Sequence, residues 1–325
     1  MLTAGAVSYA TESLVVEVDG APLAPDLAAR LLAVTVDDCT AQPGAFSLSF
    51  RDPFHDAVEK GRFAFGASVT VALADGTVLL SKAELTARDS EVDPAGTITV
   101  VRGFDLSHRL HRGRATEIYR QVRYSDVART VARRASLETG RVDTPRTAVK
   151  PQVTQCNASD WDFLTSLARE IGYEVAVVDG RLTFAPRPEA SSASVTITPD
   201  DLVRLRCVVS AAEQAAQVEV RGWNPQLKQE VVATAAVAPR GSELAEAPAA
   251  AASKVGGATL TSVAGLYHDT RDATAAAGAL AEQVGDAYGT LEGVAHGNPG
   301  LRAGTVVSLE GAGAGFDGDY TLTAT

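Results

Sequence analysis

The sequence predicts a mainly β fold that is interrupted by a small α/β unit. Three observations lead to this prediction. Short strand patterns separated by turn residues fill residues 14–104, two amphipathic helices and a hairpin follow between residues 112 and 190, and strand patterns return after residue 193. Alternating apolar and polar residues are typical of half-buried strands, whereas apolar residues three and four apart are typical of helices.

The first β region contains the clearest turn signal. Residues 45–50 alternate apolar and polar side chains, and Asp75-Gly76 separates the apolar runs 69–73 and 77–80. Asp-Gly between two apolar runs predicts a hairpin, because both residues tolerate a positive φ angle. Many short antiparallel strands within about 90 residues favour a barrel or a sandwich.

The α/β unit is predicted from helix caps. Ser125 can cap a helix that runs to Ala135 and stops at Gly140, and Ser159 can cap a second helix that stops at Gly172. A serine side chain accepts a hydrogen bond from an otherwise unpaired backbone N–H at a helix start. The apolar face of the second helix comprises Trp161, Leu164, Leu167, Ala168 and Ile171. Asp179-Gly180 then predicts a hairpin.

Strand patterns resume after the α/β unit, among them residues 202–210, 305–309 and 319–323. A helix is expected near residues 273–288, and the Ala-, Pro- and Gly-rich stretch 233–256 is expected to be an exposed loop. The predicted domains are a first β region at residues 1–111, the α/β unit at residues 112–193 with two helices and a hairpin, and a second β region at residues 194–325.

The composition excludes several classes of protein. The 325 residues carry a net charge of −11, which disfavours nucleic-acid binding. Three widely spaced cysteines predict neither a disulfide framework nor a zinc site and suit synthesis in the cytoplasm. No signal peptide and no transmembrane helix are expected.

Catalytic patterns are weak. Asp160 and Asp162 lie two apart on a predicted helix and therefore point apart, and Asp317 and Asp319 flank a glycine in a predicted turn. General acid–base cleavage of glycans needs two carboxylates that face each other across the substrate. The Gly-x-Ser-x-Gly nucleophile motif and a phosphate-binding loop are absent from the sequence. We therefore expect no enzyme activity and no metal or other cofactor.

Three segments stand out when taken together. Residues 103–114 read Gly-Phe-Asp-Leu-Ser-His-Arg-Leu-His-Arg-Gly-Arg, and residues 155–164 read Gln-Cys-Asn-Ala-Ser-Asp-Trp-Asp-Phe-Leu. Residues 297–307 read Gly-Asn-Pro-Gly-Leu-Arg-Ala-Gly-Thr-Val-Val, and Phe-Asp-Gly-Asp-Tyr follows at 316–320. In this order they resemble the VgrG and phage late control D family of spike hub proteins. The closest resemblance is to the hubs of extracellular contractile injection systems.

This resemblance implies both a fold and a function. Such hubs carry two tube-like antiparallel β-barrels that flank a small α/β domain, and three copies form a ring. The resemblance implies a structural baseplate hub that joins a sixfold inner tube to a threefold spike and transmits force on contraction. The implied partners are two further copies, inner tube proteins, a spike tip protein and baseplate components, with no nucleic acid and no membrane insertion. The hub would be part of a contractile particle that can be released from the cell. Family members usually continue into further domains, so this chain is expected to be the hub part of a longer protein.

Five side chains are candidates for a subunit interface or for packing. They are Trp161, Phe163, Arg109, Arg112 and Arg114. The simpler interpretation is that Trp161 packs its helix on the following hairpin. The arginines would then form a solvated loop that pairs locally with Asp105 or Glu117. The alternative function is a receptor- or carbohydrate-binding β-domain at a particle tip, and a glycan hydrolase is less favoured. The low aromatic content, 6%, argues against a carbohydrate-binding surface.

Overall fold

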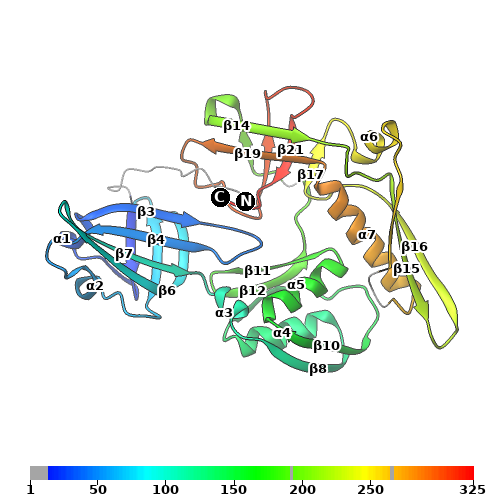
Figure 1. Cartoon of the computed structure of the whole chain (residues 1–325), viewed down its shortest axis with the longest axis horizontal. Coiled ribbons are helices and arrows are strands. Elements are labelled where there is room, and N and C mark those ends of the chain that lie inside the picture. The colour runs from blue at the N-terminus through cyan, green and yellow to red at the C-terminus, as the bar shows by residue number, and fades with distance from the viewer. Residues whose placement is uncertain (1–13, 191–192, 264–266) are drawn as a thin grey trace.

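A seven-stranded antiparallel sheet forms the first β region of the computed structural model, which describes residues 14–190, 193–263 and 267–325 (Figure 1). The strand order is β2-β1-β5-β6-β7-β4-β3. The strands are β1 (Leu14–Val18), β2 (Ala21–Pro22), β3 (Leu31–Asp37), β4 (Ala45–Arg51), β5 (Ser68–Leu73), β6 (Val78–Asp93) and β7 (Gly96–Phe104). Two short helices, α1 (Pro25–Ala28) and α2 (Ala57–Lys60), accompany the sheet.

Alternation along β4 explains how this sheet builds a core. Phe46, Leu48 and Phe50 are buried, while the residues between them are only partly buried. The hairpin predicted at Asp75-Gly76 is confirmed: Gly76 has a φ of +90°, and the side chain of Asp75 accepts a hydrogen bond from the backbone N–H of Thr77 at 2.8 Å. A β turn of this kind needs a residue that tolerates positive φ.

The first sheet does not close into a barrel within the described residues. Its edges are β2 and β3, so the barrel inferred from the resemblance is not found in this chain by itself. The reason lies in β2, which has two residues, ends in Pro22 and leads into α1 at Pro25. Proline has no N–H to continue a ladder of hydrogen bonds, so no strand is left to bridge the gap to β3.

The α/β unit follows with three strands, β11-β12-β9, and a separate two-stranded ribbon, β8–β10. Its elements are α3 (His108–His111), β8 (Ala115–Val122), α4 (Tyr124–Arg134), β9 (Glu138–Val142), β10 (Lys150–Ala158), α5 (Asp160–Glu170), β11 (Tyr173–Val178) and β12 (Arg181–Pro186). The Ser159 cap is confirmed, since its hydroxyl accepts from the backbone N–H of Asp162 at 3.0 Å. The Ser125 cap was wrong: Arg123 is the cap residue, and its N–H donates to Asp126 at 2.9 Å, so the helix starts before Ser125.

A sheet covered by one long helix comes next. β15 (Gln217–Asn224) pairs with β16 (Gln229–Ala236) and β18 (Thr259–Ser262), and α7 (Thr270–Asp286) packs on it, close to the helix predicted at 273–288. The loop predicted at 233–256 was wrong. That stretch contains the end of β16, strand β17 (Ser242–Leu244) and helix α6 (Pro248–Lys254). Alanine is the best helix former and proline suits the first turn, so this composition supports a helix.

The C-terminal β region is split into two parts. One is a four-stranded sheet, β13-β20-β21-β17, and the other is a two-stranded ribbon, β14–β19. The strands not yet given are β13 (Val195–Ile197), β14 (Leu202–Val209), β19 (Gly289–Ala295), β20 (Val306–Leu309) and β21 (Gly318–Thr321). The ribbon and the sheet share no ladder of hydrogen bonds, so the second predicted barrel is also open in the described chain. Among the described residues, no helix has both the length and the apolar character needed to span a membrane.

Candidate assembly site in the C-terminal β region

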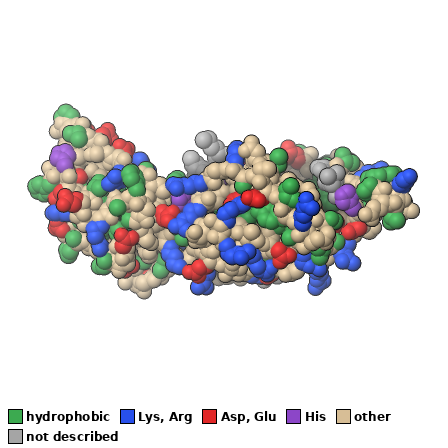
Figure 2. Space-filling model, turned by 90° about the horizontal axis from the view of Figure 1, so that it is seen from below, with side chains coloured by type: hydrophobic (Ala, Val, Ile, Leu, Met, Phe, Trp, Pro, Cys, Tyr) green, Lys and Arg blue, Asp and Glu red, His purple; other side chains and the backbone are tan. Residues whose placement is uncertain are grey.

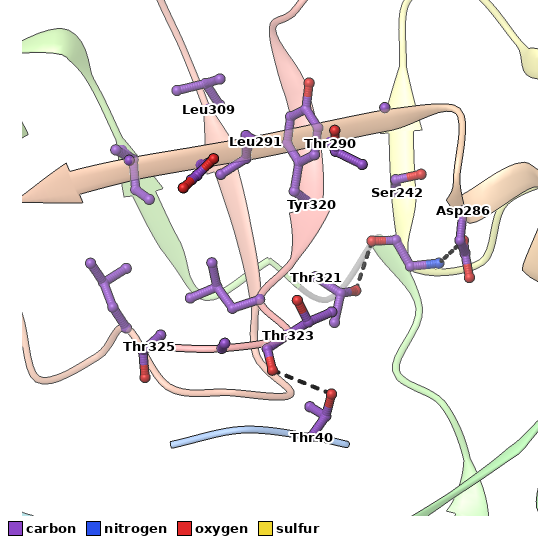
Figure 3. A pocket seen from close by; sticks show the side chains of 18 of the residues that line it. Thr40, Ser242, Asp286, Thr290, Leu291, Leu309, Tyr320, Thr321, Thr323 and Thr325 are labelled. Atoms are coloured by element: carbon purple, nitrogen blue, oxygen red, sulfur yellow. Dashed lines mark hydrogen bonds between the residues drawn. The ribbon is translucent and has the colours of Figure 1, made fainter. Parts of the chain in front are cut away.

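A groove of about 610 Å³ separates the β14–β19 ribbon from the four-stranded sheet (Figure 3). Apolar side chains from both parts line it: Ile197, Leu202, Leu205, Leu291, Leu309 and Tyr320. Ile197, Leu309 and Tyr320 are buried, whereas Leu202, Leu205 and Leu291 are only half-buried, so the groove exposes part of an apolar interior.

The alternation of β14 accounts for the apolar side of the groove. Leu205 and Cys207 are half-buried and pack with the small C-terminal core, while Arg204 and Arg206 are exposed. On the opposite sheet, Val307 and Leu309 are fully buried. A strand with period-two alternation turns one face to a core, and here that face is only half covered.

Threonines and the last residues of the chain form the polar side of the groove. Thr40, Thr321, Thr323 and Thr325 lie together there (Figure 3). The Thr321 hydroxyl donates to the carbonyl of Gly241 at 2.7 Å. The Thr40 hydroxyl donates to the carbonyl of Thr323 at 3.4 Å, which brings the C-terminal strands beside the segment that follows β3, although the two are far apart in sequence.

We call this connection the clasp, formed by residues 38–40 and 302–303 with 322–325. Asp38 and Thr325 exchange two backbone hydrogen bonds, each of 2.8 Å, and the N–H of Thr40 donates to Thr323 at 3.0 Å. The Asp38 carboxylate also accepts from Arg302 at 3.1 Å and from the N–H of Ala303 at 3.2 Å. The clasp therefore fixes the C-terminal β region against the first one.

Partly buried charges lie at the other end of the groove. Arg187 pairs with Asp286 at 2.7 Å, and the backbone N–H groups of Arg240 and Gly241 donate to the same carboxylate at 2.8 and 2.9 Å. Burial raises the pKa of the neighbouring Glu282 carboxyl, while Arg240 and Arg187 act in the opposite direction. These pairs hold α7 against the strand exit of the α/β unit.

Tyr320 is a titratable side chain that lines the groove. Its hydroxyl donates to the carbonyl of Phe316 at 2.7 Å, and burial raises the pKa of Tyr320 to about 12. A buried phenol resists ionisation because the phenolate would lose its hydration.

The two aromatic candidates from the sequence lie in the core of the α/β unit. Trp161 and Phe163 are 7% and 5% exposed. The Trp161 ring stacks on His111 with 4.7 Å between centroids, and the Phe163 ring stacks on Tyr119 at 5.8 Å. The structure thus shows packing within the chain for both, and a role at a subunit interface stays a prediction.

The three arginine candidates separate into two kinds. Arg109 pairs with Glu84 on β6, and His108 approaches the same carboxylate at 2.7 Å. The hydrogen bond from Arg109 lowers the pKa of Glu84, and the weaker effect of His108 acts in the same direction, although burial opposes both. Arg112 and Arg114 are instead exposed, and Arg114 donates to the carbonyl of Asn157 at 2.9 Å. Arg109 therefore connects the first β region to the α/β unit, while the other two face outward.

The groove residues were missed by the sequence reasoning. Strands were expected at 202–210, 305–309 and 319–323, and their alternation was the available signal. Alternation tells which side chains share a face, but it does not tell which faces of distant strands meet.

Comparison with known proteins gives sequence relatives first. Residues 74–325 match the family described as the Alg8 N-terminal domain. The chain is also 29% identical over 144 residues to a probable baseplate hub protein of Escherichia phage 186, over 42% of this chain. That match spans 37% of the phage protein's own length.

Solved structures share the fold over almost the whole chain. The 43 kDa tail protein of prophage MuSo2 from Shewanella oneidensis has 16% identity and a TM-score of 0.67, covering 96% of this chain and 92% of that one. A tail protein from Neisseria meningitidis MC58 has 14% identity and a TM-score of 0.65, with 96% and 90% covered. Prophage tail protein gp18 from Listeria monocytogenes EGD-e has 11% identity and a TM-score of 0.58, with 96% and 89% covered.

The resemblance to spike hub proteins, first drawn from three sequence segments, is confirmed by the baseplate hub relative and by the tail-protein fold. Because the family match extends over residues 74–325, the chain belongs to the Alg8 N-terminal domain family.

Proposed function

We propose that this chain is a structural hub of a contractile injection system or phage-tail-like particle, and that it works as a ring of three copies. The baseplate hub relative and the tail-protein fold support this role. The β, α/β, β layout supports two ring modules in each copy, built from residues 1–111 and 194–325 around the α/β unit at 112–193. Three copies then present six modules to a sixfold tube and three to a spike.

The open groove of the C-terminal β region is the observation that carries the proposal. A domain that is complete within one chain covers its apolar interior. An exposed apolar surface of this kind therefore marks an interaction site. The first β region of a neighbouring copy covers the groove and completes the β structure around it. Closed threefold symmetry satisfies every such surface and leaves none free for further growth.

The junctions between the regions suit a part that transmits force. Arg109 pairs with Glu84 between the first β region and the α/β unit, and Lys150 pairs with Asp272 between the α/β unit and α7. The clasp adds a third connection. Paired charges that are partly buried favour one relative orientation, because breaking one leaves an uncompensated charge. The hub therefore moves as one body with tube, spike tip protein and baseplate components.

The first test is the native mass of the chain in solution, by light scattering after size exclusion. We expect three times the mass of one chain, 33.7 kDa. A strict monomer at concentrations of tens of micromolar, a range typical of weak association, would overturn the ring.

A matched pair of variants on β14 tests the groove itself. Leu205→Glu places a charge on the face of β14 that lines the groove. Val208→Glu places the same charge on the other face of β14, where Val208 is 41% exposed. We expect the first variant to be monomeric and the second to keep the native mass, because burying an unpaired carboxylate in an apolar interface is costly. Far-UV circular dichroism confirms that both variants are folded. Retention of the native mass by folded Leu205→Glu would show that the groove is not the interface.

A further inference from the structure

The β8–β10 ribbon of the α/β unit presents an unusual free surface. In the described part of the chain each of its strands pairs only with the other, so the outer edge of β8 has unpaired backbone groups. Thr116, Ile118 and Arg120 alternate along one exposed face of β8, and Ile118 is 55% exposed. An open strand edge with an exposed aliphatic side chain is a ready template for another strand.

This ribbon also lies in the basic part of an acidic protein. Residues 108–190 contain fourteen Lys and Arg against ten Asp and Glu, whereas the whole chain has a net charge of −11. Figure 2, which shows the molecule from below, has Lys and Arg side chains gathered over the middle of that face. Arg112, Arg114 and Arg120 form no ion pair within the described residues, and all three are exposed. They are therefore available to a partner.

A second free edge of opposite charge lies on the first β region. β5 pairs with β6 only as far as Glu84, so the outer edge of β6 from Arg88 to Asp93 is unpaired in the described chain. This stretch is exposed throughout. The first β region as a whole, residues 14–107, has seven Lys and Arg against fourteen Asp and Glu.

The acidic side chains on this edge have the spacing that a strand partner needs. Asp89, Glu91 and Asp93 alternate along β6 and share one face, together with Ile98, the cross-strand neighbour of Glu91. Asp89 pairs with Arg102 at 3.6 Å, but Glu91 and Asp93 have no cationic partner among the described residues. Ile98 is 41% exposed.

We propose that the free edge of β6 in one copy adds to the free edge of β8 in the next copy. Both strands alternate with a period of two, so pairing them places the carboxylates of Glu91 and Asp93 beside Arg114 and Arg120. Ile98 and Ile118 then lie on the same side of the joined sheet. The contact is head to tail, and it closes when the rotation between copies is threefold. This inference rests on the proposed ring and names a contact within it that is separate from the groove.

Charge reversal tests the pairing. Glu91→Lys with Asp93→Lys forms one variant, and Arg114→Glu with Arg120→Glu forms the other. We expect each alone to weaken association at least tenfold in 150 mM salt, and the four changes combined in one chain to recover much of it, because every contact in the ring then joins a reversed β6 edge to a reversed β8 edge. Glu59→Lys and Lys228→Glu, which change exposed charges elsewhere, are the controls and should associate as the parent chain does.

A crosslink tests the geometry directly. Glu91→Cys and Ile118→Cys are combined with Cys156→Ser, since Cys156 is an exposed native cysteine. Paired strands bring Cβ atoms within the range that a disulfide bridges. We expect oxidation to produce species of two and three chains on a non-reducing gel, and either single cysteine variant to produce no three-chain species.

The outcomes distinguish this contact from the ring itself. A parent chain that is trimeric, with charge variants that are equally trimeric and without a crosslink, overturns the β6–β8 contact and leaves the ring standing. A monomeric parent chain overturns both. Nucleic acid that copurifies with the parent but not with the arginine variant, with no change in protein mass, would assign the basic face to nucleic acid instead and overturn the proposal.

Discussion

The two β regions of this chain are built from similar strands but differ in how much they bury. Among the described residues, the core of the first β region contains fifteen buried hydrophobic residues, whereas the C-terminal core contains four: Ile197, Val307, Leu309 and Tyr320. The difference does not come from a lack of apolar residues, because Leu202, Leu205 and Leu291 lie beside the smaller core and are only half-buried. A shared strand pattern thus supports one region that is complete within the chain and one that is left open.

The largest effect should come from emptying the complete core. Phe50 is fully buried, and Phe50→Ala should lower the free energy of unfolding by about 3–5 kcal/mol, through lost burial and the cavity left behind. Phe54→Ala is the matched control, since Phe54 is 72% exposed and its loss should cost less than about 0.5 kcal/mol. Urea denaturation at protein concentrations low enough to keep the chain monomeric measures the unfolding free energy of both variants. Equal costs would remove the basis for calling this region self-contained.

The clasp should contribute an intermediate amount. Asp38→Ala removes the acceptor of two hydrogen bonds, from Arg302 and from the N–H of Ala303, and should cost about 1–2 kcal/mol. In Asp38→Ala, backbone hydrogen exchange should become faster in residues 322–325, while exchange in β4 should stay as in the parent chain. Unchanged exchange there would mean that the backbone hydrogen bonds of the clasp suffice without the carboxylate.

Tyr320 allows the smaller core to be tested by pH. Tyr320→Phe loses the hydrogen bond to Phe316 and should cost about 1 kcal/mol at neutral pH. The folded pKa is raised to about 12 from the ordinary value of 10, so its contribution to stability is present below pH 10 and is lost as the pH rises toward 12. Between pH 9 and 11 the parent should lose more stability than Tyr320→Phe. Parallel losses in the two proteins would indicate that Tyr320 ionises normally.

The smallest effect should come from the open groove. Leu205→Ala in the monomer should cost less than about 1 kcal/mol, because the side chain is only half-buried and its loss creates no closed cavity. The same substitution should raise the concentration needed for association. A cost equal to that of Phe50→Ala would mean that the groove is already filled within one chain, and the contrast between the two regions would fail.

What could be predicted from the sequence was local. The Ser159 cap and the Asp75-Gly76 turn depend on residues within a few positions of each other, and both are confirmed. The loop expected at 233–256 failed because an alanine-rich composition was taken as lack of structure, although alanine favours helices. The partner of Arg109 was expected nearby, at Asp105 or Glu117, but it is Glu84, 25 residues away.

The groove and the clasp could not be predicted for a related reason. They depend on which faces of distant strands meet, and alternation within a strand does not contain that information. The Thr40 and Thr323 contact joins residues 283 positions apart. The mainly β character and the central α/β unit followed from local patterns, but the openness of both sheets did not.

The clasp also has a consequence for the order of events during synthesis. All pairings of the first sheet lie within residues 14–104, so that sheet can form while the ribosome is still adding the rest of the chain. The backbone groups of residues 38–40, which follow β3, stay exposed to water until residues 322–325 have been synthesised and can form hydrogen bonds with them. Contacts of such long sequence separation form slowly. Until that step the two β regions are tethered only through the α/β unit, so a newly made chain reaches its full set of contacts only after its C-terminal strands have docked.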